Sequence, residues 1–230
     1  MSESNHEVES TVSRRGFIAA GVASAALVGL GGAGKALAKS TNATYVRPPG
    51  VVSEEDFLSR CNRCQRCVMV CPYSIVQPLS LTKNFLSQNT PIMNFKTGYC
   101  DYCNKCMEVC PTGALTLDAP TSTNLGVAKV IKDVCVAWEW SGCIKCHDVC
   151  PVEGAITLDE HNRPVVHEDL CNGCGLCEHE CPASSLRAYS ASALPRGIFV
   201  VPRDSEAAQL KGSITSEEYV SGYEVKHKEA

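Results

Sequence analysis

Two short strings of alternating apolar and polar residues recur along the chain. Residues 113–118 read Gly-Ala-Leu-Thr-Leu-Asp, and residues 154–159 read Gly-Ala-Ile-Thr-Leu-Asp. Alternation with a period of two after a glycine predicts a turn that leads into a short strand. The apolar runs at 127–134 and 164–167 predict strands that return beside them, and the run at 197–201 predicts one more strand.

The remaining segments predict a short helix, loops and a linker. Ser53 has the side chain of an N-cap and is followed by two glutamates, so a short helix that begins after it would lead to Cys61. Residues 39–52 contain the helix-breaking triplet Pro-Pro-Gly and predict a linker. Residues 79–98 predict a mostly polar loop, and residues 203–230 predict a polar tail of mixed charge.

The cysteines change this picture, because the chain contains 16 of them and they fall into four quartets, each followed by proline. Three quartets have the spacing C-x2-C-x2-C-x3-C-P, which is that of the bacterial ferredoxins. In the third quartet, residues 136–142 are inserted after the first cysteine. The quartets are Cys61, Cys64, Cys67 and Cys71; Cys100, Cys103, Cys106 and Cys110; Cys135, Cys143, Cys146 and Cys150; and Cys171, Cys174, Cys177 and Cys181.

This spacing has a physical reason. Three thiolates two residues apart wrap a tight loop around one corner of an iron–sulfur cubane, and the x3 step and the proline redirect the chain towards a neighbouring cluster. No cysteine is left over, so the sequence predicts four 4Fe–4S clusters with all 16 cysteines as iron ligands. Cys135 fits the general motif least well. Trp138 and Trp140 beside it either cover hydrophobic surface, which we favour, or shield a cluster or dock a partner.

Two other uses of the cysteines are disfavoured. A zinc scaffold uses pairs of C-x-x-C knuckles separated by longer loops, and three cysteines at two-residue intervals do not suit a tetrahedral ion. A disulfide framework explains neither the prolines nor the regular spacing, and cysteines two apart cannot all bridge comfortably.

Composition supports a small protein that metal sites hold together. Aromatic residues make up only 6% of the chain, and a metal that binds only the folded state adds its binding free energy to folding. The formal net charge is −4, and four oxidised clusters with their thiolates would bring it to roughly −12. No basic cluster suggests a nucleic-acid partner. No catalytic triad order, phosphate loop or dinucleotide fingerprint suggests an enzyme or a small-molecule substrate.

The N-terminus carries the pattern of an export signal. The pair Arg14-Arg15 precedes an uncharged, glycine-rich run and then Ala-Leu-Ala at 36–38, so residues 1–38 resemble a twin-arginine signal peptide. The alternative is an uncleaved signal that serves as a membrane anchor. Because the bacterial periplasm is oxidising, we expect the clusters to be loaded in the cytoplasm and the folded protein to be exported to the periplasm.

A twin-arginine signal followed by four ferredoxin quartets resembles the MauM/NapG family of ferredoxin-type proteins, from Ser13 to about Arg187. The resemblance, strongest to the NapG members, implies the 16 cysteines as cluster ligands. It also implies an electron carrier that takes electrons from a membrane quinol-oxidising protein, NapH-like, as a component of a quinol dehydrogenase complex. The implied acceptor is periplasmic nitrate reductase or a cytochrome c. The alternative is an iron–sulfur beta-type subunit of another exported molybdoenzyme.

The predicted fold class is α+β, with two bacterial-ferredoxin-like modules of short hairpins and short helices around four 4Fe–4S clusters. They occupy residues 53–202, with the quartets at 61–71, 100–110, 135–150 and 171–181. Because a ferredoxin module has pseudo-twofold symmetry, the matching strings after the second and third quartets predict that these two pair in an inner module. The first and fourth would then form an outer module, and pairing of adjacent quartets is the alternative.

Overall fold

The computed structural model of the protein describes residues 45–80, 87–140, 142–183, 196–203 and 205–216, which belong to one folded unit that begins at Ala43. The predicted signal at 1–38 lies outside the described residues and stays a prediction. In the described part of the chain, no helix is long and apolar enough to cross a bilayer.

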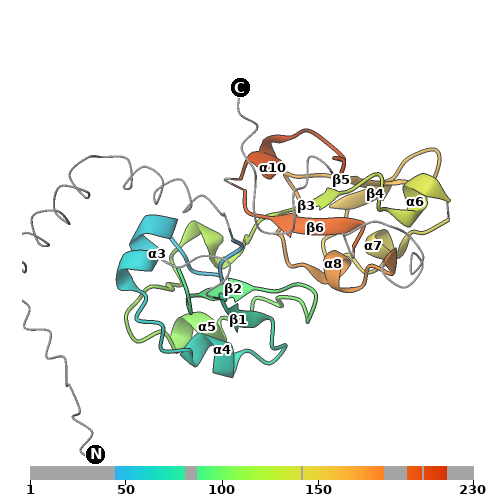
Figure 1. The fold of residues 1–230 in the computed structure, drawn as a ribbon. Helices are drawn as coiled ribbons and strands as arrows, with labels where there is room; N and C mark the ends of the chain where they lie inside the picture. The colour runs from blue at the N-terminus through green and yellow to red at the C-terminus, as the bar shows by residue number, and fades with distance from the viewer. Residues whose placement is uncertain (1–44, 81–86, 141, 184–195, 204, 217–230) are drawn as a thin grey trace, which may run out of the picture. The chain divides into compact units, whose positions relative to one another are not determined.

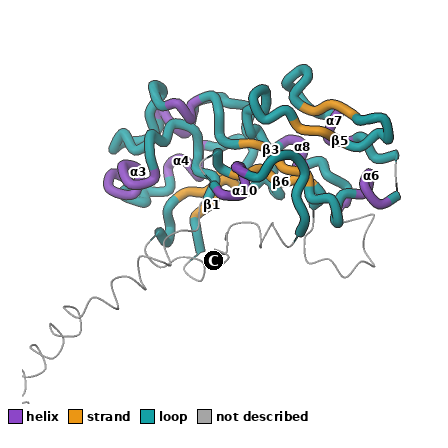
Figure 2. Tube along the Cα trace, turned by 90° about the horizontal axis from the view of Figure 1, so that it is seen from above, coloured by secondary structure: helices purple, strands orange, loops and turns teal. Residues whose placement is uncertain are grey.

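Short helices and two-stranded antiparallel sheets alternate along this unit (Figure 1), and loops and turns connect them over much of the trace (Figure 2). This is the α+β character that the sequence predicts. The elements are α3 (Glu54–Arg60), α4 (Arg66–Val70), β1 (Val76–Pro78), β2 (Pro91–Met93), α5 (Lys105–Glu108), the 3-10 helix η1 (Pro120–Ser122), β3 (Val127–Val130), α6 (Val136–Glu139), α7 (Lys145–Asp148), β4 (Ile156–Leu158), β5 (Pro164–Val166), α8 (Leu176–His179), β6 (Ile198–Val201) and α10 (Glu206–Gln209).

The third and fourth quartets lie in a complete ferredoxin-like arrangement, which we call the second module. Strands β4 and β5 form a hairpin between the two quartets, as predicted for 154–159 and 164–167. Strands β3 and β6 enclose both quartets in the sequence and pair with each other, with Val127 opposite Val201 and Val130 opposite Ile198. The predicted strand at 197–201 is therefore present, and its partner is β3.

The first and second quartets lie in the first module, where β1 and β2 form the hairpin between them. The prediction of a polar loop over 79–98 is wrong at β2, whose three residues are all buried. An apolar run of three residues that begins with proline gives almost no periodic signal, which explains the error.

The string 113–118 does not form the predicted strand. Ala114 and Leu115 are buried in a small core with Phe57 and Met107, and Thr116 N donates a hydrogen bond of 2.8 Å to Gly50 O. Gly50 has φ +98°, and a Cβ there would lie 2.7 Å from the Met107 side chain and 2.8 Å from Thr116 N. Glycine at position 50 thus allows the segment before α3 to approach the string 113–118 closely, although the two do not form a strand pair.

The helix at Ser53 is confirmed. The Ser53 side chain accepts a hydrogen bond from Asp56 N at 3.2 Å. Cys61 caps the C-terminal end of α3, and its N–H donates to Phe57 O at 2.8 Å. The segment before it is packed, because Tyr45, Val46 and Val51 are buried. The described half of the predicted linker therefore belongs to the fold.

The folded unit also continues past the predicted boundary at residue 202. Ile214 is buried and forms a parallel bridge with Ile131, with two backbone hydrogen bonds of 2.8 Å to Val130 and Lys132. The buried Lys129 ammonium binds the Glu168 carboxylate and the Leu210 carbonyl, each at 2.5 Å. The polar composition after residue 203 hid these few anchoring contacts, so the described tail residues are not a free tail.

Candidate iron-sulfur cluster sites

Three of the four quartets share one backbone conformation. In quartets one, two and four the residues immediately before and after the second cysteine have positive φ, between 57° and 81°. These residues are Arg63 and Gln65, Tyr102 and Asn104, and Gly173 and Gly175. Two left-handed residues that flank one cysteine turn the chain tightly, so the three cysteines can face a common centre while backbone N–H groups point inward.

A side-chain amide or carboxylate supports each of these loops. The residue after the first cysteine accepts a hydrogen bond from the N–H of the second cysteine, at 3.1–3.3 Å. The acceptors are Asn62, Asp101 and Asn172. Sequence reasoning missed this role, although an Asn or Asp directly after the first cysteine of three quartets was a usable signal for an Asx turn.

The third quartet departs from this pattern, as its spacing predicts. Cys135 is buried and precedes α6, which the inserted residues form. The ring of Trp138 packs against the core and lies 5.1 Å from Lys132 Nζ and 4.8 Å from the Arg163 guanidinium. The interpretation that the tryptophans cover hydrophobic surface therefore holds for Trp138, whereas Trp140 is 60% exposed.

The helices show which quartets lie together. Helix α4, which carries the third cysteine of quartet one, packs against α5 of quartet two, and α7 of quartet three packs against α8 of quartet four. The electrostatic neighbours agree within the first module. Burial and then the thiols of Cys61, Cys64 and Cys110 raise the pKa of Cys67 to about 11. Burial and then the thiols of Cys100, Cys67, Cys103 and Cys71 raise the pKa of Cys106 to about 12. The thiols that raise the pKa of Cys100 are those of Cys103 and Cys71.

The second module repeats the exchange of fourth cysteines. Burial and then the thiols of Cys135, Cys181 and Cys143 raise the pKa of Cys146 to about 12. Burial is also the main cause that raises the pKa of Cys174, and the thiols of Cys171 and Cys150 add to it.

Four sites result from these neighbours, and each takes its fourth cysteine from the adjacent quartet, as in a bacterial ferredoxin. Site I contains Cys61, Cys64, Cys67 and Cys110; site II contains Cys100, Cys103, Cys106 and Cys71; site III contains Cys135, Cys143, Cys146 and Cys181; and site IV contains Cys171, Cys174, Cys177 and Cys150.

The prediction of an inner and an outer module is therefore wrong, and the alternative of adjacent pairing is right. The prediction relied on the likeness of the strings 113–118 and 154–159, but only the second of them is a strand. The hairpins β1–β2 and β4–β5 each connect neighbouring quartets. A short hairpin returns the chain close to the quartet that precedes it. Quartet one therefore pairs with quartet two, and quartet three pairs with quartet four.

The thiols fit a cluster better than a single ion. All 16 cysteines are described and none forms a disulfide. Among the described residues, no three Cys, His, Asp or Glu side chains are close enough to hold one metal ion. Thiols that share a centre without converging on one ion suit a cubane, whose ligand sulfurs lie about 6–7 Å apart.

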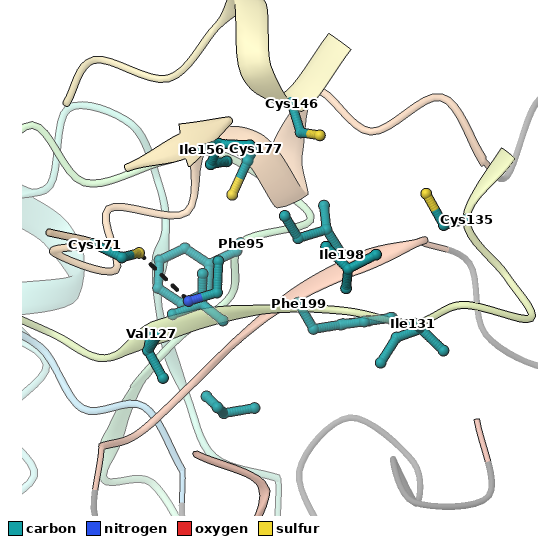
Figure 3. Packing of buried hydrophobic residues seen from close by; sticks show 14 of the residues in the cluster. Phe95, Val127, Ile131, Cys135, Cys146, Ile156, Cys171, Cys177, Ile198 and Phe199 are labelled. Carbon is teal, nitrogen blue, oxygen red and sulfur yellow. Dashed lines mark hydrogen bonds between the residues drawn. The ribbon is translucent and has the colours of Figure 1, made fainter. Parts of the chain in front are cut away.

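Backbone N–H groups point at several sulfurs, as a cluster site requires. Ala128 N lies 3.4 Å from Cys171 Sγ, and Gly197 N lies 3.3 Å from Cys181 Sγ. Figure 3 shows the first of these contacts, with Cys171 and Cys177 among buried side chains that include Phe95. At Cys110 burial raises the pKa, but hydrogen bonds from the N–H groups of Leu115 and Thr112 outweigh it and lower the pKa.

One buried carboxyl lies beside these sites. Glu178 follows Cys177, and its Oε2 accepts a hydrogen bond of 2.9 Å from Val200 N in β6. Burial raises the pKa of Glu178 to about 7. Sequence reasoning did not single it out, because a glutamate in a short helix is usually solvent-exposed.

The site geometry defines a protein with two dicluster ferredoxin-type modules, and comparison with known proteins agrees. The model of the 4Fe-4S dicluster domain matches residues 60–114 and 141–185. The first match covers quartets one and two, and the second covers quartet four and three cysteines of quartet three.

Known relatives give the family. The chain is 36% identical over 194 residues to the methylamine utilization ferredoxin-type protein MauM of Methylorubrum extorquens. The alignment covers 74% of this chain and 84% of that protein. It is 33% identical over 152 residues to the ferredoxin-type protein NapG of Escherichia coli. That alignment covers 59% of this chain and 65% of NapG. Escherichia coli NapF is 33% identical over 147 residues, 62% of this chain and 84% of NapF.

This protein belongs to the MauM/NapG family of ferredoxin-type proteins. It is an iron–sulfur protein of the electron-carrier class, and its cofactors are 4Fe–4S clusters.

Proposed function

We propose that the protein carries four 4Fe–4S clusters and relays electrons in the periplasm from a membrane quinol-oxidising protein to a soluble acceptor. The observation that supports this most directly is the exchange of fourth cysteines within each module, which divides 16 thiols into four sets of four. When bound, the clusters supply one-electron redox chemistry. The chain itself holds the thiolates, donates N–H groups to sulfur and limits the access of water.

Iron and sulfide analysis tests the cluster count. We expect anaerobically purified protein to contain close to 16 irons and 16 acid-labile sulfides per chain, from four cubanes of four each. A reproducible plateau near eight irons, or zinc in place of iron, would contradict the proposal.

The N-terminal pattern supports the proposed destination in the periplasm. Free thiols would be oxidised in the periplasm, so a chain whose cysteines are all free favours loading before export. We expect Arg14→Lys with Arg15→Lys to leave the protein in the cytoplasm, because the twin-arginine translocase reads that pair. Fractionation measures this, and undiminished periplasmic protein would show that the signal is of another kind.

The electron donor that we propose is a NapH-like membrane protein, and the acceptor is periplasmic nitrate reductase or a cytochrome c. The donor would make the chain one component of a quinol dehydrogenase complex and hold it near the membrane. Reduction of the purified holoprotein by membranes that contain the donor and a quinol, monitored by loss of visible absorbance, tests the first half. Reoxidation by each purified acceptor tests the second half.

The relatives support a second destination. MauM proteins, named for methylamine utilization, match this chain over a larger share of its length than NapG. An acceptor in methylamine oxidation is therefore the alternative, and the same reoxidation assay distinguishes it. A permanent beta-type subunit of another exported molybdoenzyme would instead co-purify with its catalytic subunit in a fixed ratio.

A further inference from the structure

The cysteine loops of quartet two and quartet four touch each other across the two modules, which belong to the same folded unit. Cys100 N donates a hydrogen bond to Cys174 O at 2.8 Å. Beside it, the Tyr102 hydroxyl donates to Asn172 O at 2.5 Å, and Leu125 N donates to the same carbonyl at 2.9 Å. We call this contact the Tyr102 junction. It joins the backbone of site II directly to that of site IV.

The glycines of quartet four indicate that this contact is built into the sequence. Quartets one and two use side-chain-bearing residues at both left-handed positions, whereas quartet four uses Gly173 and Gly175. A Cβ on Gly175 would lie 1.8 Å from Cδ1 of Phe95, which belongs to the first module. A Cβ on Gly173 would lie 2.5 Å from Gly126 N. The left-handed turn alone does not require glycine here, but the close approach of the other segments does.

The positions of the two contact residues show which sites the junction joins. Tyr102 lies between Cys100 and Cys103 of site II in the sequence, and its hydroxyl binds the carbonyl of Asn172, which lies between Cys171 and Cys174 of site IV.

Within each module, the two sites lie on helices that pack against each other. Helix α4, which carries Cys67 of site I, packs against α5, which carries Cys106 of site II. Helix α7, which carries Cys146 of site III, packs against α8, which carries Cys177 of site IV. Together with the Tyr102 junction, these contacts connect the sites in the order I, II, IV, III.

We propose that the Tyr102 junction is the place where electrons pass between the modules, so that the four sites form a path in the order I, II, IV, III. Each passage moves one electron from a reduced site to an oxidised neighbour, with no bond formed or broken and no proton transferred. The path would follow the chain through the first module and run against it through the second. Sites I and III become its ends. This inference rests on the proposed cluster content, but not on the identity of the donor or acceptor.

Two variants of the full-length holoprotein test the order. Cys64→Ser with Cys143→Ser should leave clusters in sites II and IV, and Cys64→Ser with Cys174→Ser should leave them in sites II and III. None of the replaced cysteines is fully buried, so the fold is perturbed little. After reduction with dithionite, electron paramagnetic resonance should show spin–spin splitting and fast relaxation in the first variant. The second should show two almost independent signals.

The opposite result, or equal interaction in both variants, overturns the proposed order. Iron analysis of each variant is read first. A chain that binds no iron contradicts the proposed function, whereas a loaded chain with the wrong coupling contradicts the path alone. Dithionite replaces the biological donor, so an error in the donor does not affect the result.

A milder variant tests the junction itself if a double variant does not fold. In the otherwise unchanged holoprotein, Tyr102→Phe removes the hydroxyl that binds Asn172 O, and we expect unchanged iron content with weaker coupling between sites II and IV. Tyr73→Phe is the matched control, because Tyr73 lies near Cys71 and Cys100 of site II but its ring packs against that of Tyr99, with centroids 4.6 Å apart and planes tilted by 37°. Equal loss of coupling in both variants, or no loss in either, would contradict the role of the junction.

Discussion

The first and second modules hold their cysteines in similar loops but close their outer edges differently. In the second module, β3 and β6 pair over four residues on each strand. In the first module, the hydrogen bonds from Thr116 N to Gly50 O and from Met93 N to Val46 O, both 2.8 Å, take the place of that sheet. The hairpin between the quartets and the packed helix pair are common to both modules. The cysteine geometry therefore depends on these two features, and the outer strand pair can be reduced to a few contacts.

Each module also uses one buried cation to hold a segment at its edge. In the first module, Arg47 binds Glu54 at 2.9 Å through Nε and Thr90 Oγ1 at 2.8 Å, and its guanidinium lies 5.0 Å from the centre of the Phe57 ring. In the second module, Lys129 is 1% exposed and binds Glu168 and the Leu210 carbonyl. Arg47 thus keeps a hydroxyl and an aromatic partner when its carboxylate is lost, which makes the two anchors unequal.

The largest expected effect comes from the fourth cysteine of a quartet, because it belongs to the neighbouring site. Cys110→Ser should remove the cluster of site I and about a quarter of the iron. Alkylation followed by mass spectrometry should then find Cys61, Cys64 and Cys67 reactive. Cys181→Ser is the matched variant in the second module and should expose the first three cysteines of quartet three instead.

Exposure of quartet three in the Cys110→Ser variant would contradict adjacent pairing. It would restore the pairing of quartets two and three that the likeness of the two strings predicts.

The next effect is the pH dependence of cluster loading, and it should differ between modules. A thiol must lose its proton before it binds iron. In site IV, burial raises the pKa of Cys177 well above its ordinary value and also raises the pKa values of Cys174 and Cys150. In site I, burial raises the pKa of Cys67 to about 11, but hydrogen bonds lower the pKa of Cys110. Loading should therefore release protons and become more favourable as the pH rises. Between about pH 6.5 and 9, site IV should need a higher pH than site I to reach the same degree of loading.

Anaerobic reconstitution at several pH values, with alkylation of the unfilled cysteines, measures this order. Site IV filling at the same pH as site I would show that burial does not control loading.

Loss of the carboxylate partner should lower the free energy of unfolding more at Lys129 than at Arg47. Glu168→Gln leaves the ammonium of Lys129 buried with a carbonyl partner, and we expect it to lower the free energy of unfolding by about 2–3 kcal/mol. Glu54→Gln should cost about 1 kcal/mol, because Arg47 keeps its other partners and Glu54 is half exposed. Denaturant titration of both holoproteins checks the difference, and equal costs would mean that the anchors are equivalent.

The sequence predicted the local features of this fold correctly where a residue type or a pattern is typical of one structure. The cap at Ser53, the hairpin β4–β5 and the strand β6 follow from a side-chain oxygen before a helix and from clear alternation. It failed where a contact is made by single hydrogen bonds, as at Gly50 and Thr116, because no periodic pattern marks such a contact. The burial of Tyr45 and of Ile214 was not predicted for the same reason, because each residue lies in a mostly polar or proline-rich segment.

The candidate sites show the same limit. The cysteine spacing predicts four quartets, because tight loops follow from two-residue intervals. It contains no information about which quartets pair, since the spacing is equal within all regular quartets. That pairing depends on the hairpins, and β1–β2 was the hairpin that the sequence did not reveal. The Tyr102 junction lies further from prediction, because it joins residues about 70 positions apart through backbone atoms.

The smallest effect we predict concerns the helix that leads into site I. Ser53→Ala removes the acceptor for Asp56 N, and we expect a loss of about 1 kcal/mol in the free energy of unfolding. Ser59→Ala is the control on the same helix, because its exposed hydroxyl donates to Asp56 O at 2.8 Å and its loss should change stability by no more than about 0.5 kcal/mol. Since Cys61 caps the C-terminal end of α3, fraying of the helix should open site I first. Alkylation in mild denaturant should therefore reach Cys61 in the Ser53→Ala variant before it reaches Cys171 of the second module, and simultaneous labelling of the two would mean that the modules open as one unit.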